Sequence, residues 1–267
     1  MDFLKGEIMA VDKPYRMSSF GALAHVRYVM SKRLGKKVKI GHAGTLDPLA
    51  TGVLVLCTGK KTKLIEQLQT HTKEYVATMQ LGATTDSYDR EHTVNRTYPK
   101  EQISLELIRS VLPQFIGDIS QVPPTYSAVK VNGDRAYSLR RKGDSVELAP
   151  KTVRIDEIEI LDFNAHEKTL AIRVVCGKGT YIRALARDIG EALGSGAHLT
   201  SLRRTRVGNV AVESCEQLDA LLTRLDGETY VSSEEAERQR IEAERVANRA
   251  REAAKKARQK QKTAVAE

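Results

Sequence analysis

The sequence predicts an α+β fold with a mixed, largely antiparallel sheet flanked by helices. Some segments alternate apolar and polar residues as half-buried strands do, and others repeat apolar residues at helical spacing. The two kinds do not follow one another in regular strand–helix–strand units, which argues against a parallel α/β sheet. The chain has 267 residues, 41% of them hydrophobic, which suffices for one large core or two small ones.

Five segments are predicted to be strands, because they are short apolar runs or alternate in polarity. In chain order they are Ile8–Asp12, Val53–Cys57, Lys73–Leu81, Val153–Leu161 and Leu170–Cys176. The third alternates most regularly, with Tyr75, Ala77, Met79 and Leu81 on one face.

Three segments are predicted to be helices. Their apolar positions are Leu23, Val26 and Met30 in the first, Ile108, Val111, Leu112 and Phe115 in the second, and Ile182, Leu185, Ala186, Ile189 and Leu193 in the third. Either Ser18 or Ser19 is expected to cap the first helix, and Thr180 the third. Gly194 stands where a C′ glycine ends a helix.

The composition changes sharply near the C-terminus. From Glu234 to Glu267 the chain is almost entirely Glu, Arg, Lys, Gln and Ala, without an apolar stripe. We therefore expect a catalytic domain in residues 1–228 and a charged tail in residues 229–267, the tail being a solvated helix or disordered. An auxiliary RNA-binding arm and a solubilising extension explain such a tail equally well.

The net charge of +9 favours a polyanionic partner, either a nucleic acid or an anionic membrane surface. The tail contributes +3, so the rest of the chain is basic as well. The longest apolar run is too short to cross a bilayer, and the N-terminus lacks a signal-peptide pattern. The three cysteines are far apart and form no CxxC pair, which indicates neither a disulfide framework nor a zinc site. We expect a cytoplasmic protein.

Residues 41–48, Gly-His-Ala-Gly-Thr-Leu-Asp-Pro, form the first segment that can carry chemistry. Two glycines and a proline bracket Asp47, and a buried strand follows, so this loop can hold a carboxylate rigidly at a cleft. Considered alone, Asp47 is better explained as a turn-capping residue before Pro48, which is a common role for aspartate.

Two further segments combine glycines with basic residues. Residues 176–183 lie between a predicted strand and a predicted helix. Arg183 there can pair with a carboxylate, and a surface arginine on a helix explains it equally well. In residues 196–206, Arg203, Arg204 and Arg206 are candidates for phosphate contacts, with a solvated basic face as the alternative.

Residues 122–137 mix Pro, Gly and Asn with aromatic and basic residues, Lys130 among them. This composition fits a long loop that closes over a polyanion. It fits a plain hairpin around Asn132-Gly133 as well.

Taken together and in this order, these segments resemble the TruB-type tRNA pseudouridine synthases. Residues 41–54 match the catalytic-aspartate motif of that family with almost no deviation. The other matching segments are Lys13-Pro14 with Ser18-Ser19, Lys73-Glu74-Tyr75, Leu81-Gly82 with Thr85, Asp86 and Asp89, residues 123–137, residues 178–183 and residues 196–205. The resemblance extends from about Gly6 to Leu222.

The resemblance implies an isomerase that converts a uridine in the T loop of tRNA, at position 55, to pseudouridine without a cofactor or metal. It implies that Asp47 is the catalytic carboxylate and that Arg183 is its ion-pair partner. Tyr75 is expected against the uracil, where it is also a candidate base, and Tyr181 is expected to hydrogen-bond at the aspartate. The partner implied is the T arm of tRNA, bound by a monomer.

The resemblance also implies substrate contacts. His42 is expected to occupy the space left in the RNA loop when the uridine is extruded, and Leu202 to line the pocket for the base. The remaining substrate contacts are assigned to the basic residues Lys13, Lys130, Arg203 and Arg204.

The chain departs from the family pattern at three points. Arg16 and His92 stand where the family usually has glycine, and the charged tail stands where many members have a compact RNA-binding domain of the PUA type. Two other functions compete with the synthase. One is a non-catalytic RNA-binding or tRNA-folding module, which the intact set of four site residues disfavours. The other is a nuclease, which would need paired carboxylates for metal ions.

Overall fold

The computed structural model describes residues 2–127, 129–131, 133–142 and 146–227. Its strands are β1 Ile8–Lys13, β2 Ile40–His42, β3 Thr51–Thr58, β4 Lys73–Leu81, β5 Ala83–Thr85, β6 Val94–Thr97, β7 Gly117–Gln121, β8 Lys130–Val131, β9 Asp134–Arg135, β10 Lys151–Asn164, β11 Thr169–Cys176, β12 Ala197–Val207, β13 Val210–Ala211 and β14 Glu216–Gln217. Its α-helices are α1 Ser19–Leu34, α2 Ile65–Gln69, α3 Leu105–Val111, α4 Ala136–Arg141, α5 Ile182–Ala192 and α6 Leu218–Gly227.

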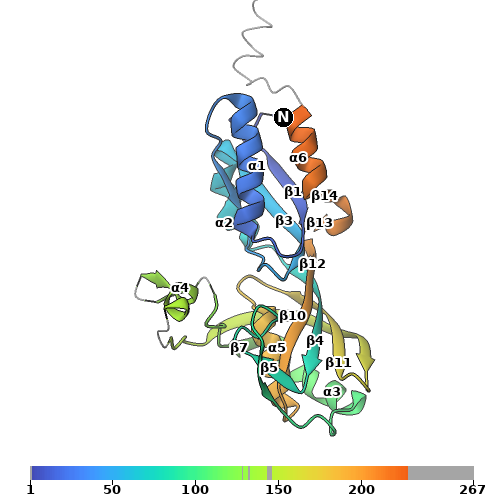
Figure 1. The fold of residues 1–267 in the computed structure, drawn as a ribbon. Coiled ribbons are helices and arrows are strands. Elements are labelled where there is room, and N and C mark those ends of the chain that lie inside the picture. The colour runs from blue at the N-terminus through green and yellow to red at the C-terminus, as the bar shows by residue number, and fades with distance from the viewer. Residues whose placement is uncertain (1, 128, 132, 143–145, 228–267) are drawn as a thin grey trace, which may run out of the picture.

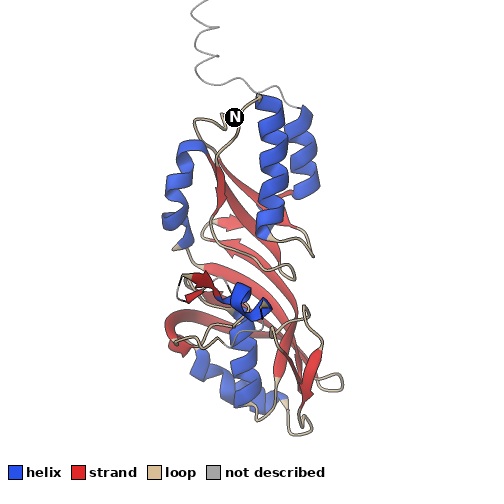
Figure 2. Ribbon diagram, turned by 60° about the vertical axis from the view of Figure 1, so that its left-hand side comes forward, coloured by secondary structure: helices blue, strands red, loops and turns tan. Residues whose placement is uncertain are grey.

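One ten-stranded sheet runs through the length of the molecule (Figure 1). Its main path is β14-β1-β3-β12-β4-β11-β10-β7, with β2 added to β3 and β13 to β12. Among the described strands of this sheet, only the pairs β1–β14 and β12–β3 are parallel. Helices cover both ends of the sheet, with α1 and α6 at one end and α5 and α3 at the other (Figure 2). The predicted α+β class with a mixed, largely antiparallel sheet is confirmed.

The predicted elements agree well with those observed. The five predicted strands appear as β1, β3, β4, β10 and β11, and β4 has the predicted bounds. Ser18 caps α1 by accepting a hydrogen bond from Gly21 N. The second predicted helix is α3 followed by a 3-10 turn over Leu112–Phe115, where Pro113 has no backbone N–H for a longer helix. The hairpin alternative is confirmed by the pairing of β8 with β9.

Two expectations about local structure need correction. Thr180 does not cap α5: the N-cap is Tyr181, and the Thr180 hydroxyl instead faces the carbonyl oxygens of Arg154 and Gly177. Residues 197–207 are a strand at the centre of the sheet, although the sequence predicts only a basic segment there. The alternation of β12 is hard to recognise because two of its buried positions hold His198 and Arg204.

Two hydrophobic clusters flank the point where β3 and β12 meet. One joins α5 to β4, β11 and β12, and the other joins α1 and α6 to β1 and β3. Because β12 belongs to both halves of the sheet, it fixes the loop before β3 relative to the start of α5. Within the described ranges, no helix has the length and apolar character needed to span a membrane.

The contact between β3 and β12 predicts a specific steric sensitivity at Gly52. This residue has φ of 101°, and a Cβ atom there would lie 2.2 Å from the Arg204 carbonyl oxygen. Gly52→Ala should therefore lower the free energy of unfolding by about 3 kcal/mol or more, measured by urea denaturation.

Gly35 provides the matched control. Its φ is 61°, but nothing lies within 4 Å of a Cβ at that position. Gly35→Ala should cost only about 1 kcal/mol, the price of the left-handed conformation alone. Equal losses for the two variants would contradict the close packing of β3 on β12.

Candidate active site

A cavity of about 310 Å³ lies where the loop before β3 meets β4, β12 and the start of α5. Six side chains expected at the site line it, although they come from separate parts of the chain: Asp47, Tyr75, Tyr181, Arg183, Leu202 and Arg204. The first belongs to the loop, the second to β4, the third and fourth to the start of α5, and the last two to β12.

Arg183 and Asp47 form an ion pair at this cavity. Arg183 Nε lies 2.8 Å from Asp47 Oδ2, although the N–H is not aligned well enough for a hydrogen bond. The Arg183 side chain is 5% exposed and that of Asp47 is 36% exposed. A molecule in the cavity can therefore reach the carboxylate, whereas the Arg183 side chain is almost entirely buried.

The Arg183 guanidinium is held from two further sides. Its Nη1 donates to the Ser87 carbonyl oxygen at 3.0 Å, and its Nη2 donates to the Tyr126 carbonyl oxygen at 2.8 Å. These contacts fix the plane of the guanidinium, and hence the direction from which it meets Asp47.

Asp89 is a second carboxylate at Arg183, and sequence reasoning did not assign it to the site. Its side chain is fully buried, and its Oδ2 lies 3.6 Å from Arg183 Nε. Its Oδ1 accepts hydrogen bonds from Ser87 Oγ at 2.5 Å and Glu91 N at 2.9 Å. Nothing in the local sequence separates Asp89 from Asp86, so only the fold reveals which of them is buried against the arginine.

Tyr75 and Tyr181 border the cavity as neutral phenols. Burial raises the pKa of Tyr75, although the nearby Arg204 cation lowers it in part. Burial likewise raises the pKa of Tyr181, against the lowering effect of the neighbouring Ser127 hydroxyl. A phenol with a raised pKa stays protonated and so cannot readily accept a proton. Tyr75 therefore suits contact with the uracil ring better than the general-base role considered from the sequence.

Comparisons with known proteins agree with this geometry. A family model described as the TruB family pseudouridylate synthase N-terminal domain matches residues 32–182. A second, the tRNA pseudouridylate synthase B C-terminal domain, matches residues 183–241. The chain belongs to the TruB family. The resemblance stated from the sequence is thereby confirmed.

Two curated relatives illustrate how close the chain is to other TruB members. It is 58% identical to a protein named tRNA pseudouridine synthase B of Phocaeicola vulgatus, over 85% of this chain and 96% of that protein. It is 61% identical to the protein of the same name of Bacteroides fragilis, over 80% of this chain and 92% of that protein.

The fold is also similar to that of solved structures. A chain in a crystal structure of a Cbf5-Nop10-Gar1 complex matches with a TM-score of 0.61 at 30% identity, over 84% of this chain. A chain in a structure of an H/ACA RNP bound to a substrate RNA containing 2'-deoxyuridine matches with a TM-score of 0.59 at 28% identity, over 83% of this chain. The TruB chain described here spans about half the length of these two chains, 55% and 53%.

Two basic residues expected to contact RNA lie inside the protein instead. Arg204 is 1% exposed, and it donates from Nε to the Val53 carbonyl oxygen at 2.7 Å and from Nη2 to the Gly44 carbonyl oxygen at 3.2 Å. Lys13 is fully buried, and its Nζ donates to the carbonyl oxygens of Pro14 and Met17. We therefore reassign both side chains to holding the loops around Asp47 in place.

The other expected RNA contacts are more accessible. Arg203 is partly exposed and forms an ion pair with Asp12 at 2.7 Å. His42 ends β2 and is half-buried; burial lowers its pKa and so favours the neutral ring. Lys130 lies in β8, and its side chain is outside the described part of the chain. Among the described residues, no group of three or more His, Cys, Asp or Glu side chains could hold a metal ion.

Arg16, which stands where the family usually has glycine, adopts a backbone conformation that favours glycine. Arg16 has φ of 62°, in the left-handed region that favours glycine, the residue usual in the family at this position. Its backbone N–H donates to the Pro48 carbonyl oxygen at 2.9 Å. This turn therefore supports the loop that carries Asp47.

Buried Lys13 gives a pH-dependent prediction. Burial lowers its pKa to about 8 from 10.5, so above pH 8 the folded chain releases this proton before the unfolded chain does. The free energy of unfolding should therefore rise with pH between about 8 and 10.5, by about 1 kcal/mol per pH unit relative to Lys13→Met. Urea denaturation of both proteins across this range measures the effect, and a constant difference would contradict it.

Proposed function

We propose that this chain isomerises a uridine in the T loop of tRNA, at position 55, to pseudouridine, with Asp47 as the catalytic carboxylate. The observation that carries the proposal is the ion pair of Asp47 with a buried Arg183 at the cavity of a TruB-family chain. The choice of tRNA is supported by the names of the curated relatives, each a tRNA pseudouridine synthase B.

The reaction breaks the bond from C1′ to N1 of uridine, turns the base, and forms a bond from C1′ to C5. The proton at C5 leaves, and N1 gains one, so there is no net redox change or hydrolysis. Detaching the base builds positive charge at C1′. A carboxylate beside C1′ can stabilise that charge, bond to the carbon, or direct the loss of a neighbouring proton. Asp47 is exposed enough to do this.

Arg183 serves the reaction by positioning Asp47. The ion pair and the two hydrogen bonds of Arg183 hold the guanidinium in one orientation. The guanidinium in turn orients the Asp47 carboxylate toward the cavity. Misplacement of a catalytic group by about 1 Å costs on the order of a hundredfold in rate. A carboxylate on a loop needs such a rigid support.

The detached uracil needs a surface on which to turn. Tyr75 and Leu202 come from adjacent strands, β4 and β12, and both line the cavity. A flat ring beside an aliphatic side chain holds a base by stacking without fixing its rotation. Tyr181, the N-cap of α5, borders the same space and is proposed to hydrogen-bond at the aspartate.

The uridine must leave its loop before it can reach Asp47. His42 lies five residues before Asp47, at the end of β2, and a neutral imidazole there can replace the lost stacking in the RNA loop. Arg203 and Arg206, both on β12, then meet phosphates, so affinity for tRNA falls as the salt concentration rises.

Position mapping tests the substrate assignment. An unmodified tRNA transcript incubated with the protein should gain one pseudouridine, in the T loop at position 55, detected by chemical derivatisation and primer extension. A transcript with cytidine at that position is the control and should gain none. Modification at another uridine, or none at all, would contradict the proposal.

A second prediction concerns Arg183. Arg183→Lys should lower the single-turnover rate by about a hundredfold or more, because a point charge cannot make the two directed hydrogen bonds and the ion pair of the guanidinium at once. The dissociation constant for tRNA should change by less than about threefold.

Arg173→Lys is the matched control. Arg173 also joins several carboxylates, Glu74, Glu157 and Glu159, but on β11 and outside the cavity. Its turnover should stay near that of the wild type. A wild-type turnover rate for Arg183→Lys would contradict the proposal that Arg183 positions Asp47.

A further inference from the structure

The hydroxyl group of Ser19 binds a single residue of the loop that carries Asp47. Its Oγ accepts a hydrogen bond from Leu46 N at 2.7 Å and donates one to the Leu46 carbonyl oxygen at 2.9 Å. Ser19 is the first residue of α1, lies 27 positions earlier in the sequence than Leu46, and is 1% exposed. Both hydrogen-bonding functions of one buried hydroxyl are therefore used on the residue before Asp47.

These two bonds act on the backbone that leads into Asp47. The Leu46 carbonyl belongs to the peptide group that contains the backbone nitrogen of Asp47, and this group is planar. Ser19 thereby restrains the rotation that would swing Asp47 toward the cavity or away from it. The Leu46 side chain is 3% exposed and packs in the hydrophobic cluster of α5, β4, β11 and β12, so the residue is held from a second side as well.

The residue after Asp47 is held from the same stretch of chain. Arg16 N donates to the Pro48 carbonyl oxygen at 2.9 Å. The buried Lys13 Nζ stiffens the turn around Arg16 by donating to two carbonyl oxygens within it. Residues 13–19 therefore bind the loop on both sides of Asp47.

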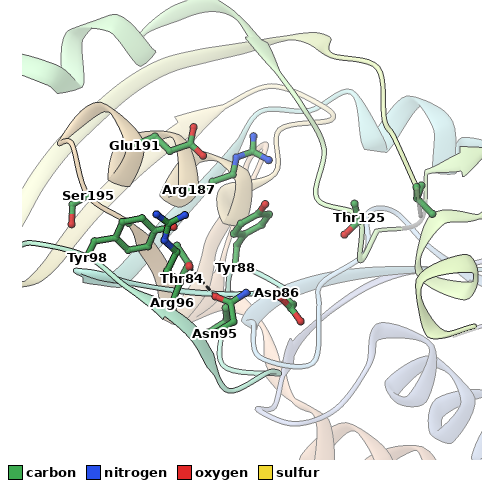
Figure 3. Close-up of a pocket in the computed structure, with 13 residues that line it drawn as sticks. Thr84, Asp86, Tyr88, Asn95, Arg96, Tyr98, Thr125, Arg187, Glu191 and Ser195 are labelled. Atoms are coloured by element: carbon green, nitrogen blue, oxygen red, sulfur yellow. Dashed lines mark hydrogen bonds between the residues drawn. The ribbon is translucent and has the colours of Figure 1, made fainter. Parts of the chain in front are cut away.

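Helix α5 supports the side chain of Asp47 and not its backbone. Arg183, in the first turn, forms the ion pair with the carboxylate. Four residues later, about one helical turn, Arg187 lines a separate cavity of about 630 Å³ together with Tyr88 and Tyr98 (Figure 3). The peptide groups on either side of the aspartate are held from the start of α1 instead.

We propose that Ser19 is a positioning residue of the active site: its hydroxyl fixes the backbone of Asp47, as Arg183 fixes the direction of the Asp47 carboxylate. The proposal rests on the proposed function, because it takes Asp47 as the group whose place decides the rate. A guanidinium alone leaves the Cα atom free to move with its loop, so the carboxylate needs both supports. Misplacing a catalytic group by about 1 Å costs on the order of a hundredfold in rate.

A purely structural role for the hydroxyl is the alternative. The neighbouring Ser18 has such a role, since its Oγ accepts from Gly21 N at 2.9 Å and caps the helix to which it belongs. Ser19 differs because both of its bonds leave α1 and reach the loop before β3. The two adjacent serines therefore allow helix stability and the placement of Asp47 to be tested separately.

The test is the single-turnover rate constant for pseudouridine formation in tRNA, measured at saturating protein. A partly unfolded variant has a raised apparent dissociation constant and an unchanged saturating rate constant, whereas a displaced Asp47 lowers the rate constant itself. Ser19→Ala should lower the saturating rate constant by about tenfold or more, with the dissociation constant within about threefold of the wild-type value. A wild-type rate constant would overturn the proposal.

Two control variants remove a hydroxyl elsewhere. Ser18→Ala deletes the cap of α1, so it should lower the midpoint of urea denaturation and keep the saturating rate constant within about twofold of the wild type. Thr58→Val deletes a fully buried hydroxyl that accepts from Glu7 N at 2.9 Å outside the active-site cavity, and it should behave likewise. Equal losses of rate in Ser18→Ala and Ser19→Ala would overturn the proposal, because the effect would then belong to the helix as a whole.

Conservative variants decide the question if Ser19→Ala does not fold. Ser19→Thr keeps the hydroxyl and adds a methyl group, whereas Ser19→Cys offers only a weak donor and a weak acceptor. The threonine variant should have the higher saturating rate constant, even where crowding by its methyl group lowers the urea midpoint. Equal rate constants for the two variants would contradict the role of the hydroxyl.

The double variant Ser19→Ala/Arg183→Lys shows whether both residues act on the same group. Residues that act as a unit have strongly non-additive effects on rate. The loss in the double variant should therefore be clearly smaller than the product of the two single losses. A loss equal to that product would place the effect of Ser19 elsewhere than at Asp47.

The wild-type protein is assayed in parallel on the same tRNA. Absence of product from the wild type would count against the proposed function. Normal conversion by the wild type, together with an equal rate constant for Ser19→Ala, would count against the positioning role of Ser19 alone.

Discussion

The site depends on one buried guanidinium. Arg183 meets Asp47 through Nε and the carbonyl oxygens of Ser87 and Tyr126 through its two terminal nitrogens, and Asp89 lies behind it. A buried arginine is stable only when its charge is balanced and its donors are used. Three loops that are distant in the sequence are therefore brought to the start of α5, and their positions are coupled to that of Asp47.

Further buried cations support the same region. Arg204, Lys13 and Lys73 each donate to backbone carbonyl oxygens, and so hold loops against strands. Desolvation lowers the pKa of both lysines to about 8. Such groups stabilise the fold only if the carbonyls remain in place, which makes the shape of the cavity sensitive to the packing of β12 on β3.

Periodicity predicts most of the fold, because β1, β3, β4, β10 and β11 carry regular apolar patterns. It fails at β12, where a buried arginine and histidine interrupt the pattern, and at the N-terminus of α5, where no side chain caps the helix. Asp47, Tyr75, Tyr181 and Arg183 are recognisable together only through the family motifs. Nothing in the sequence marks Asp89 as buried or places Tyr88 beside Tyr98, because those relations depend on how β5, β6 and α5 pack.

The most direct test of the account is the single-turnover rate of Asp47→Asn on tRNA, measured together with its dissociation constant. The substitution keeps the size of the side chain but removes its charge. If Asp47 is the catalytic carboxylate, pseudouridine formation should fall by more than about a thousandfold, while the dissociation constant stays within about threefold of the wild-type value. A rate within tenfold of the wild type would contradict the central role of Asp47.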